Sequence, residues 1–245
     1  MDGQDKVAIV TGASRGIGAA IAERLAADGF RLAVNYAGRS AEAEALCAAI
    51  EAKGGRALAA QADVSDPAAV ARLFDSAETA FGGVDLLVNN AGIMRLAPIG
   101  ESDDDLFDRQ LAINLKGSFN TMREAARRLR DGGRIVNLSS SVVGLLPPRY
   151  GVYAATKAAV EAMTRIMAKE LRGRNITVNA VAPGPTATAL FLDGKSEAEV
   201  DALARLAPLE RLGCPEDIAG VVAFLAGPDG AWVNGQVLRA NGGFI

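Results

Sequence analysis

The chain has 245 residues, with 26 basic against 29 acidic side chains, 27 glycines, two cysteines and no histidine. Without histidine, a histidine-dependent nucleophilic triad and a histidine-ligated metal site are both excluded, so acid–base chemistry would depend on Tyr, Lys, Asp, Glu or Cys. A net charge of −3 argues against general nucleic-acid binding, which requires a basic face. Half of the residues are hydrophobic, which argues against disorder and is ample for a sizeable core.

Two cysteines cannot form a disulfide framework, and Cys47 and Cys214 lack metal-ligand spacing. We expect free thiols that are buried or half-buried, with catalysis by either one as the alternative. The first six residues are acidic and polar, unlike the start of a signal peptide, and no apolar run reaches the ~18–20 residues of a membrane span. The expectation is a soluble, cytoplasmic protein with no metal and with neither nucleic acid nor membrane as a partner.

Short β-rich runs alternate with longer helical runs along the chain. Asp66 is the expected N-cap of a helix that has Pro67 at its first position. In chain order, the pattern predicts a strand at 7–10, a helix at 19–27, a strand at 31–35, a helix at 41–53, a strand at 56–60, a helix from 66 to about 81, a strand at 84–88, a short and then a long helix within 103–129, a strand at 134–138, a helix at 152–172, a strand at 176–181, helices at 197–206 and 216–225, and a strand at 236–239.

This alternation implies right-handed βαβ units, whose strands form a parallel sheet covered by helices on both faces. No linker, repeat or low-complexity tract interrupts it. The sequence therefore predicts the α/β class, as a single-domain, doubly wound Rossmann fold over residues 1–245 with a seven-stranded, mostly parallel sheet. Ligands are expected beyond the carboxyl ends of the strands.

The segment from Thr11 to Gly18 follows the first strand and opens the first helix. Gly12, Gly16 and Gly18 permit a tight turn, close approach of the backbone to a pyrophosphate, and close helix–strand packing. The N-terminus of the helix would present free N–H groups to that anion. The spacing is G-x-x-x-G-x-G rather than G-x-G-x-x-G, and an ordinary strand–helix turn is the alternative.

Residues 35–40 follow the second strand and contain no acidic residue, whereas NAD-binding proteins place Asp or Glu there to hold the ribose hydroxyls. Ser14, Arg15, Asn35 and Arg39 can instead surround a 2′-phosphate. The pattern therefore favours NADP(H) over NAD(H), and a solvated position for Arg39 is the alternative.

Tyr153 and Lys157 are four residues apart, so they project from one face of the predicted helix. A nearby ammonium favours the phenolate form of a tyrosine, which would let Tyr153 exchange a proton with a substrate oxygen. A pair exposed on the helix surface is the alternative. Ser140 ends the fifth strand, Asn114 lies in the preceding helical stretch, and residues 89–92 follow the fourth strand, where a routine turn is the alternative.

Together these residues resemble the short-chain dehydrogenase/reductase family over nearly the whole chain. The resemblance implies that Tyr153 donates the proton in carbonyl reduction and is the base in alcohol oxidation. It implies that Lys157 lowers the pKa of Tyr153 and holds the nicotinamide ribose, that Ser140 hydrogen-bonds the substrate oxygen, and that Asn114 supports a water-linked proton relay. The motifs that carry it are Thr11-Gly12-x-x-x-Gly16-x-Gly18, Asp63-Val64, Asn89-Asn90-Ala91-Gly92, Asn114, Ser140, Tyr153, Lys157 and Pro183-Gly184.

The resemblance also implies a cofactor site along one edge of the sheet. Asp63 and Val64 would meet the adenine, and residues 90–92 would line the path to the nicotinamide. The residues expected to bind the cofactor are Gly12, Ser14, Arg15, Gly16, Ile17, Gly18, Asn35, Tyr36, Asp63, Val64, Asn90, Ala91, Gly92, Tyr153, Lys157, Pro183, Gly184, Thr186 and Thr188.

Residues 34–40 look like those of NADPH-using members that reduce polycyclic naphthol-type ketones or acyl carrier protein thioesters. Arg174 fits the basic surface of carrier-protein users, but Asp131 and Gly132 do not supply its other half. Residues 185–209 correspond to the family's variable substrate lid. The apolar residues expected to form a pocket or pack within the lid are Met94, Leu145, Leu146, Pro147, Pro148, Tyr150, Ala189, Leu190, Phe191, Leu192, Leu203, Leu206 and Leu209.

Arg95 and Arg149 would meet an anionic group of a substrate, although solvated arginines are favoured. The resemblance implies a homotetramer or homodimer, paired through the helices that end near Arg130 and Arg172 and through the strand at 234–239. Two other functions remain open: an NAD-dependent sugar or steroid dehydrogenase, and a non-catalytic nucleotide sensor. The presence of both Tyr153 and Lys157 argues against the sensor.

Overall fold

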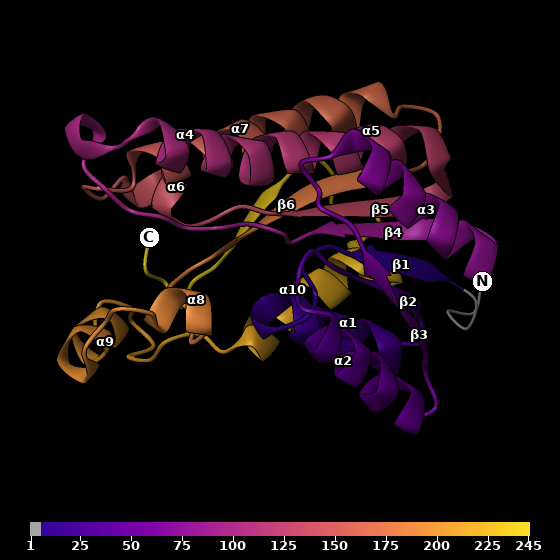
Figure 1. Ribbon diagram of the computed structural model, residues 1–245, viewed down its shortest axis with the longest axis horizontal. Coiled ribbons are helices and arrows are strands. Elements are labelled where there is room, and N and C mark those ends of the chain that lie inside the picture. Colours follow the sequence, from indigo (N-terminus) through magenta and orange to yellow (C-terminus); the bar gives the residue numbers. More distant parts are fainter. Residues whose placement is uncertain (1–5) are drawn as a thin grey trace.

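The computed structural model describes residues 6–245 and is built around one seven-stranded sheet (Figure 1). The strand order is β3-β2-β1-β4-β5-β6-β7, and each neighbouring pair is parallel. This confirms the predicted doubly wound α/β class and makes the sheet fully parallel. The strands are β1 (Val7–Val10), β2 (Arg31–Tyr36), β3 (Arg56–Gln61), β4 (Val84–Asn89), β5 (Leu129–Leu138), β6 (Thr177–Pro183) and β7 (Val237–Ala240).

Helices cover both faces of the sheet, as its two-sided hydrophobic strands require. Successive side chains of β1 point to opposite faces, so Ala8 and Val10 belong to one core cluster and Ile9 to the other. One face carries α1 (Gly16–Ala27), α2 (Ser40–Ala52) and α10 (Pro215–Ala226), and the other carries α3 (Pro67–Phe81), α5 (Gly117–Arg128) and α7 (Gly151–Glu170) (Figure 1).

Local chemistry explains where α3 begins and ends. The Asp66 carboxylate accepts a hydrogen bond from the Ala68 N–H at 2.9 Å, and Pro67 takes the first helical position, as predicted. Gly82 ends the helix in the left-handed region with φ = 85°.

Several element boundaries differ from the prediction. α1 begins at Gly16, three residues early, because the glycine turn itself enters the helix. β5 begins at Leu129 rather than 134, since Leu129 pairs with Val84 across a register shift. The stretch 103–129 contains α4 (Asp104–Gln110), a π-helical segment (Leu111–Lys116) and α5. β7 lies one residue later than predicted.

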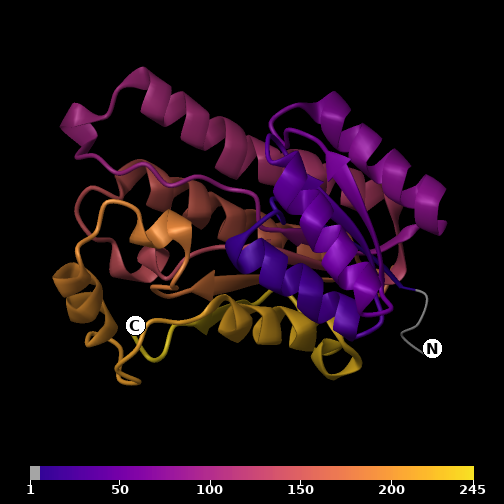
Figure 2. The same cartoon turned by 60° about the horizontal axis from the view of Figure 1, so that its bottom comes forward.

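Two short helices were not predicted, α6 (Val142–Leu145) and α8 (Ala189–Leu192), and the helix predicted at 197–206 is α9 (Glu197–Ala204). α8 and α9 lie beyond the same end of the sheet as α6 (Figures 1 and 2). A parallel β-bridge between Thr186 and Gly213 joins the two ends of the segment that contains α8 and α9. No helix within residues 6–245 is long and apolar enough to cross a membrane.

Candidate active site

The turn after β1 packs directly against the loop after β4. Gly12 and Gly16 adopt positive φ angles of 60° and 57°, a region that other residues rarely enter. A Cβ atom on Gly12 would lie 2.9 Å from the Ala91 Cα, and one on Gly18 would lie 2.5 Å from the Asn90 Nδ2. Glycine is therefore needed here because two backbones meet.

Thr11, which was not among the predicted binding residues, joins these two loops. Its Oγ1 accepts hydrogen bonds from the N–H groups of Asn90 and Ala91, both at 3.0 Å. The Asn90 amide donates in return to the carbonyl oxygens of Thr11 and Gly12 at 2.9 and 3.0 Å. The Thr-Gly pair at the end of β1 was the sequence signal for this role.

A cavity of about 890 Å³ opens beside this turn. Of the residues predicted to bind the cofactor, it brings together Gly12, Ser14, Arg15, Gly16, Ile17, Gly18, Asn35, Tyr36, Asp63, Val64, Asn90, Ala91, Gly92 and Thr188. Tyr153, Lys157, Pro183, Gly184 and Thr186 are not among its lining residues. The glycine cradle and this elongated lining fit a dinucleotide, whose phosphates need close backbone approach.

Asn35 has a different role from the one predicted. Its buried side chain accepts from the Gly12 N–H at 3.1 Å and donates to the carbonyl oxygens of Ala60 and Ala62 at 3.2 and 3.0 Å. Because both amide hydrogens are already directed at protein carbonyls, the side chain positions the glycine turn instead of offering donors to a phosphate.

Pro183, Gly184 and Thr186 continue from the carboxyl end of β6. Gly184 lies against Asn241, where a Cβ would approach the Asn241 Cβ to 2.7 Å. The Thr186 hydroxyl donates to the Gly184 carbonyl at 2.9 Å. Thr188 caps α8 and faces the glycine turn, with its Cγ2 3.6 Å from the position of a Cβ on Gly16.

Ser140, Tyr153 and Lys157 meet at the carboxyl end of β5. The Ser140 hydroxyl lies close enough to the Tyr153 phenol to lower its pKa, and it accepts a hydrogen bond from the Val142 N–H at 3.4 Å. The Lys157 Nζ lies 5.8 Å from the centroid of the Tyr153 ring and donates to the Leu138 carbonyl at 2.7 Å. The predicted surface-pair alternative is wrong for Lys157, whose exposed fraction is 5%.

The pKa shifts in this group come mainly from burial. Burial raises the pKa of Tyr153 to about 12, against a smaller lowering by the Ser140 hydrogen bond. Burial lowers the pKa of Lys157 to about 8. The expected lowering of the Tyr153 pKa by Lys157 is therefore not found in the protein alone, because removal from water outweighs an ammonium that is directed at a carbonyl.

Asn114 lies in the π-helical segment and holds the loop after β4. Its side chain exchanges two hydrogen bonds of 2.8 Å with the backbone N–H and C=O of Ile93, while its own carbonyl accepts from the Ser118 hydroxyl at 2.7 Å. A Cβ on Gly92 would lie 3.2 Å from the Asn114 Oδ1 and 3.7 Å from the Lys157 Nζ. Gly92 therefore connects the cavity wall with the Tyr153–Lys157 group.

The apolar residues expected around a substrate are largely exposed. Leu190, Leu206 and Leu209 are 44%, 60% and 64% exposed, and the Tyr150 ring meets the Tyr153 ring edge-on at 6.4 Å. Ala189 and Leu190 line the cavity beside the glycine turn.

Two of the arginines considered for substrate or carrier-protein contacts have partners within the protein. Arg95 pairs with Asp105 at 2.7 Å. Arg174 pairs with Asp131 at 2.8 Å and also donates to the Ala126 carbonyl. These guanidinium groups are thus held by the protein itself, which weakens the case for an anionic substrate or a carrier-protein surface.

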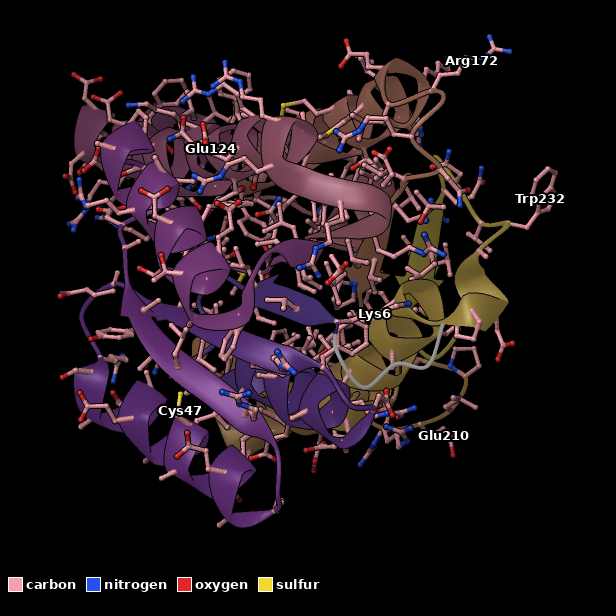
Figure 3. All side chains as sticks on the ribbon, turned by 90° about the vertical axis from the view of Figure 1, so that its right-hand side faces the viewer. Lys6, Cys47, Glu124, Arg172, Glu210 and Trp232 are labelled. Carbon is pink, nitrogen blue, oxygen red and sulfur yellow. The ribbon has the colours of Figure 1, made fainter. Side chains whose placement is uncertain are left out.

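Both cysteines are free, as predicted. Cys47 is buried on α2 (Figure 3), and burial raises the pKa of its thiol to about 11. Cys214 is half-buried at the start of α10. Neither lines the cavity beside the glycine turn, so thiol chemistry has no support at this site.

The comparisons with known proteins agree with this geometry. A family model described as enoyl-(acyl carrier protein) reductase matches residues 12–245. A short-chain type dehydrogenase/reductase of Picea abies is 50% identical, over 98% of this chain and 92% of that protein. An NADPH-dependent aldehyde reductase-like protein, described as chloroplastic, of Arabidopsis thaliana is 46% identical, over 98% and 94%.

Solved structures show the same likeness. A short-chain dehydrogenase from Burkholderia cenocepacia in complex with NADP is 43% identical, with a TM-score of 0.94 over 100% of this chain and 99% of that one. A blue fluorescent protein from a metagenomic library in complex with NADPH is 44% identical, with a TM-score of 0.92 and the same coverage. The chain therefore belongs to the short-chain dehydrogenase/reductase family of oxidoreductases.

Proposed function

We propose that this protein transfers a hydride between NADP(H) and a carbonyl or secondary alcohol of a hydrophobic or aromatic small molecule. The observation that carries the proposal is the meeting of Ser140, Tyr153 and Lys157 at the sheet edge, with Lys157 reaching the cavity wall at Gly92. The bound nicotinamide would supply or accept the hydride.

Three features support NADP(H) over NAD(H). The end of β2 carries no acidic residue to hold ribose hydroxyls. Ser14, Arg15 and Arg39 all line the cavity, so both arginines lie where a 2′-phosphate would be bound. The Burkholderia dehydrogenase and the metagenomic blue fluorescent protein were solved in complex with NADP and NADPH, and the Arabidopsis relative is described as NADPH-dependent.

In this proposal Tyr153 donates the proton in reduction. Its pKa of about 12 keeps the phenol protonated at neutral pH, and Ser140 hydrogen-bonds the substrate oxygen alongside it. Lys157, with a pKa of about 8, is an ammonium at pH 7 and stabilises the phenolate that remains. Asn114 positions the loop after β4 and supports proton exchange through Lys157.

The substrate class follows from the apolar 185–209 segment, which we propose to be the substrate lid. Exposed leucines on this segment would lose contact with water when an apolar substrate lies beneath them.

Family membership also supports one domain over residues 1–245. The helices α5 and α7 and strand β7 would supply the contacts of a homotetramer or homodimer, which light scattering would detect.

The test follows absorbance of NADPH and of NADH with a panel of aromatic and aliphatic ketones and aldehydes. We expect turnover with NADPH in preference to NADH. Tyr153→Phe should lower kcat by about 10²–10⁴-fold with an unchanged Kd for NADPH, because only the transferable proton is removed. Tyr150→Phe is the matched control and should retain turnover.

Three results would count against the proposal. Binding of nucleotide without turnover of any carbonyl would favour the nucleotide sensor. A preference for NADH would favour the NAD-dependent sugar or steroid dehydrogenase. Substantial activity of the Tyr153→Phe variant would remove the proposed role of that tyrosine.

A further inference from the structure

One end of the cavity beside the glycine turn carries three charged residues. Arg15, Arg39 and Glu42 all line it, together with Ser40 and Ala41 from the first turn of α2. Arg39 is the N-cap residue of α2 but makes no side-chain capping hydrogen bond. Its guanidinium instead pairs with Glu42, with 2.8 Å between Nη1 and Oε1.

The Glu42 carboxylate is charged at neutral pH. The hydrogen bond from Arg39 is the main cause that lowers the pKa of Glu42, and the charges of Arg39 and Arg15 act in the same direction. A dianionic phosphate placed at this end would therefore meet two positive charges and one negative charge. The Arg39 Nη1 donor that bonds Glu42 is directed away from a phosphate, and the ion pair favours this orientation of the guanidinium.

We propose that Glu42 is a specificity-determining residue that weakens binding of the adenosine 2′-phosphate, because its carboxylate holds Arg39 and repels the incoming anion. This inference rests on the proposed use of NADP(H). It follows that Glu42 reduces the preference for NADP(H) over NAD(H), since NAD(H) has no phosphate at this position and does not compete for Arg39.

Other acidic residues of this region do not share the arrangement. Asp63 also lines the cavity, but its Oδ1 accepts hydrogen bonds from the N–H and the hydroxyl of Ser65 at 2.9 and 2.8 Å. Glu44 is exposed on α2 and does not line the cavity. Glu44→Gln therefore removes the same charge from the same helix without touching Arg39, which makes it a matched control.

The test uses calorimetric titration with 2′,5′-ADP and 5′-AMP, two probes that differ by the 2′-phosphate and need no hydride transfer. Glu42→Gln should lower the Kd of 2′,5′-ADP by about two- to fivefold, the upper range of an exposed ion pair, and leave the Kd of 5′-AMP nearly unchanged. Arg39→Gln should raise the Kd of 2′,5′-ADP. In the Arg39→Gln background, removal of Glu42 should give a smaller gain.

The outcomes separate this inference from the proposed cofactor. If the wild-type protein binds 2′,5′-ADP more tightly than 5′-AMP but Glu42→Gln changes neither Kd, or changes them no more than Glu44→Gln does, the inference is overturned and NADP(H) stands. If the wild-type protein shows no preference for 2′,5′-ADP, both are overturned. A gain confined to 2′,5′-ADP supports the role of Glu42.

Discussion

Two regions of the site differ in how completely the protein itself occupies their polar groups and covers their apolar surface. They are the glycine turn with its neighbouring loops and the 185–209 segment. Around the turn, Thr11, Asn35 and Asn90 are held by hydrogen bonds to backbone, and glycines sit where a Cβ would collide. In the 185–209 segment, large apolar side chains such as Leu206 and Leu209 remain mostly exposed.

This difference indicates that the nucleotide binds to a preformed part of the site, whereas the 185–209 segment depends on its ligand to be covered. A preformed cradle loses little conformational freedom when the nucleotide binds, so its affinity depends on fixed geometry. The 185–209 segment has apolar surface that only a ligand or another surface can cover, so its contribution depends on what binds there. Substitutions in the two regions should accordingly have different effects on stability.

The largest effect is expected at Gly18. In Gly18→Ala the new Cβ would lie 2.5 Å from the Asn90 Nδ2 and 2.6 Å from the Gly12 carbonyl oxygen, so the two loops must separate. We expect a loss of about 3 kcal/mol in unfolding free energy from this overpacking, with severe loss of NADPH affinity. Urea unfolding and nucleotide titration measure both quantities.

Gly38→Ala is the control for that change, since no atom lies within 4 Å of a Cβ at Gly38. Its unfolding free energy should stay within about 0.5 kcal/mol of the wild type. Equal destabilisation by the two substitutions would show that close loop packing is not what requires glycine at position 18.

Asn35→Ala should have the next largest effect. It leaves the Gly12 N–H and the carbonyl oxygens of Ala60 and Ala62 without their side-chain partner, which should cost about 2–3 kcal/mol in unfolding free energy. Gln61→Ala, which removes one exposed hydrogen bond to the Ala37 carbonyl, should cost less than about 0.5 kcal/mol. Similar losses in the two variants would contradict the positioning role of Asn35.

The Lys157→Met variant tests whether burial of the Lys157 ammonium lowers the free energy of unfolding. Burial lowers its pKa from 10.5 to about 8, so between these pH values the unfolded chain binds a proton that the folded chain does not. The free energy of unfolding of the wild type therefore rises as pH increases from 8 to 10.5, because less charge has to be buried in the folded state. Below pH 8, the full free-energy cost of burying the Lys157 charge is present. Lys157→Met should be more stable than the wild type by about 1–3 kcal/mol at pH 7, after loss of the Leu138 contact.

The measurement is urea unfolding of both proteins at pH 7 and pH 9.5, together with turnover. The stability difference should narrow at the higher pH, while the variant stays inactive. A difference that does not change with pH would mean that burial of the Lys157 charge has no free-energy cost.

In the wild type, kcat/KM for reduction should fall above about pH 8, as the ammonium beside Tyr153 loses its proton.

The smallest effect on stability is expected in the 185–209 segment. Leu206→Ser combined with Leu209→Ser should change the unfolding free energy by less than about 0.5 kcal/mol, because both side chains are already exposed. KM for apolar ketones should rise several-fold while the Kd for NADPH stays constant. Unchanged KM with every substrate would argue against a lid role for these leucines.

Much of the fold was predictable because strand and helix patterns are local. Short β-rich runs and Gly or Pro punctuation placed all seven strands, and Asp66-Pro67 placed the start of α3. The π-helical turn around Asn114 was not predictable, because no residue type in 111–116 distinguishes it from an α-helix. The early start of β5 depends on Val84, a residue 45 positions away from Leu129.

In the candidate site, too, some features were predictable from local sequence and others depend on tertiary contacts. Glycine spacing and the Tyr153–Lys157 separation are short-range signals, and they located the turn and the proposed catalytic group. Which hydrogen bond a buried side chain makes depends on partners from other strands. The roles of Asn35, Thr11 and the Arg39–Glu42 pair therefore appeared only in the folded chain.

By itself, the sequence determined the parallel α/β architecture and the phosphate-binding type of turn, and it excluded an imidazole as proton carrier, since the chain has no histidine. The tertiary structure decided the charge balance at the cavity and the surroundings of Tyr153 and Lys157. The physical reason is that local patterns fix backbone conformation, whereas pKa values and ion pairs depend on burial and on the groups that folding brings close.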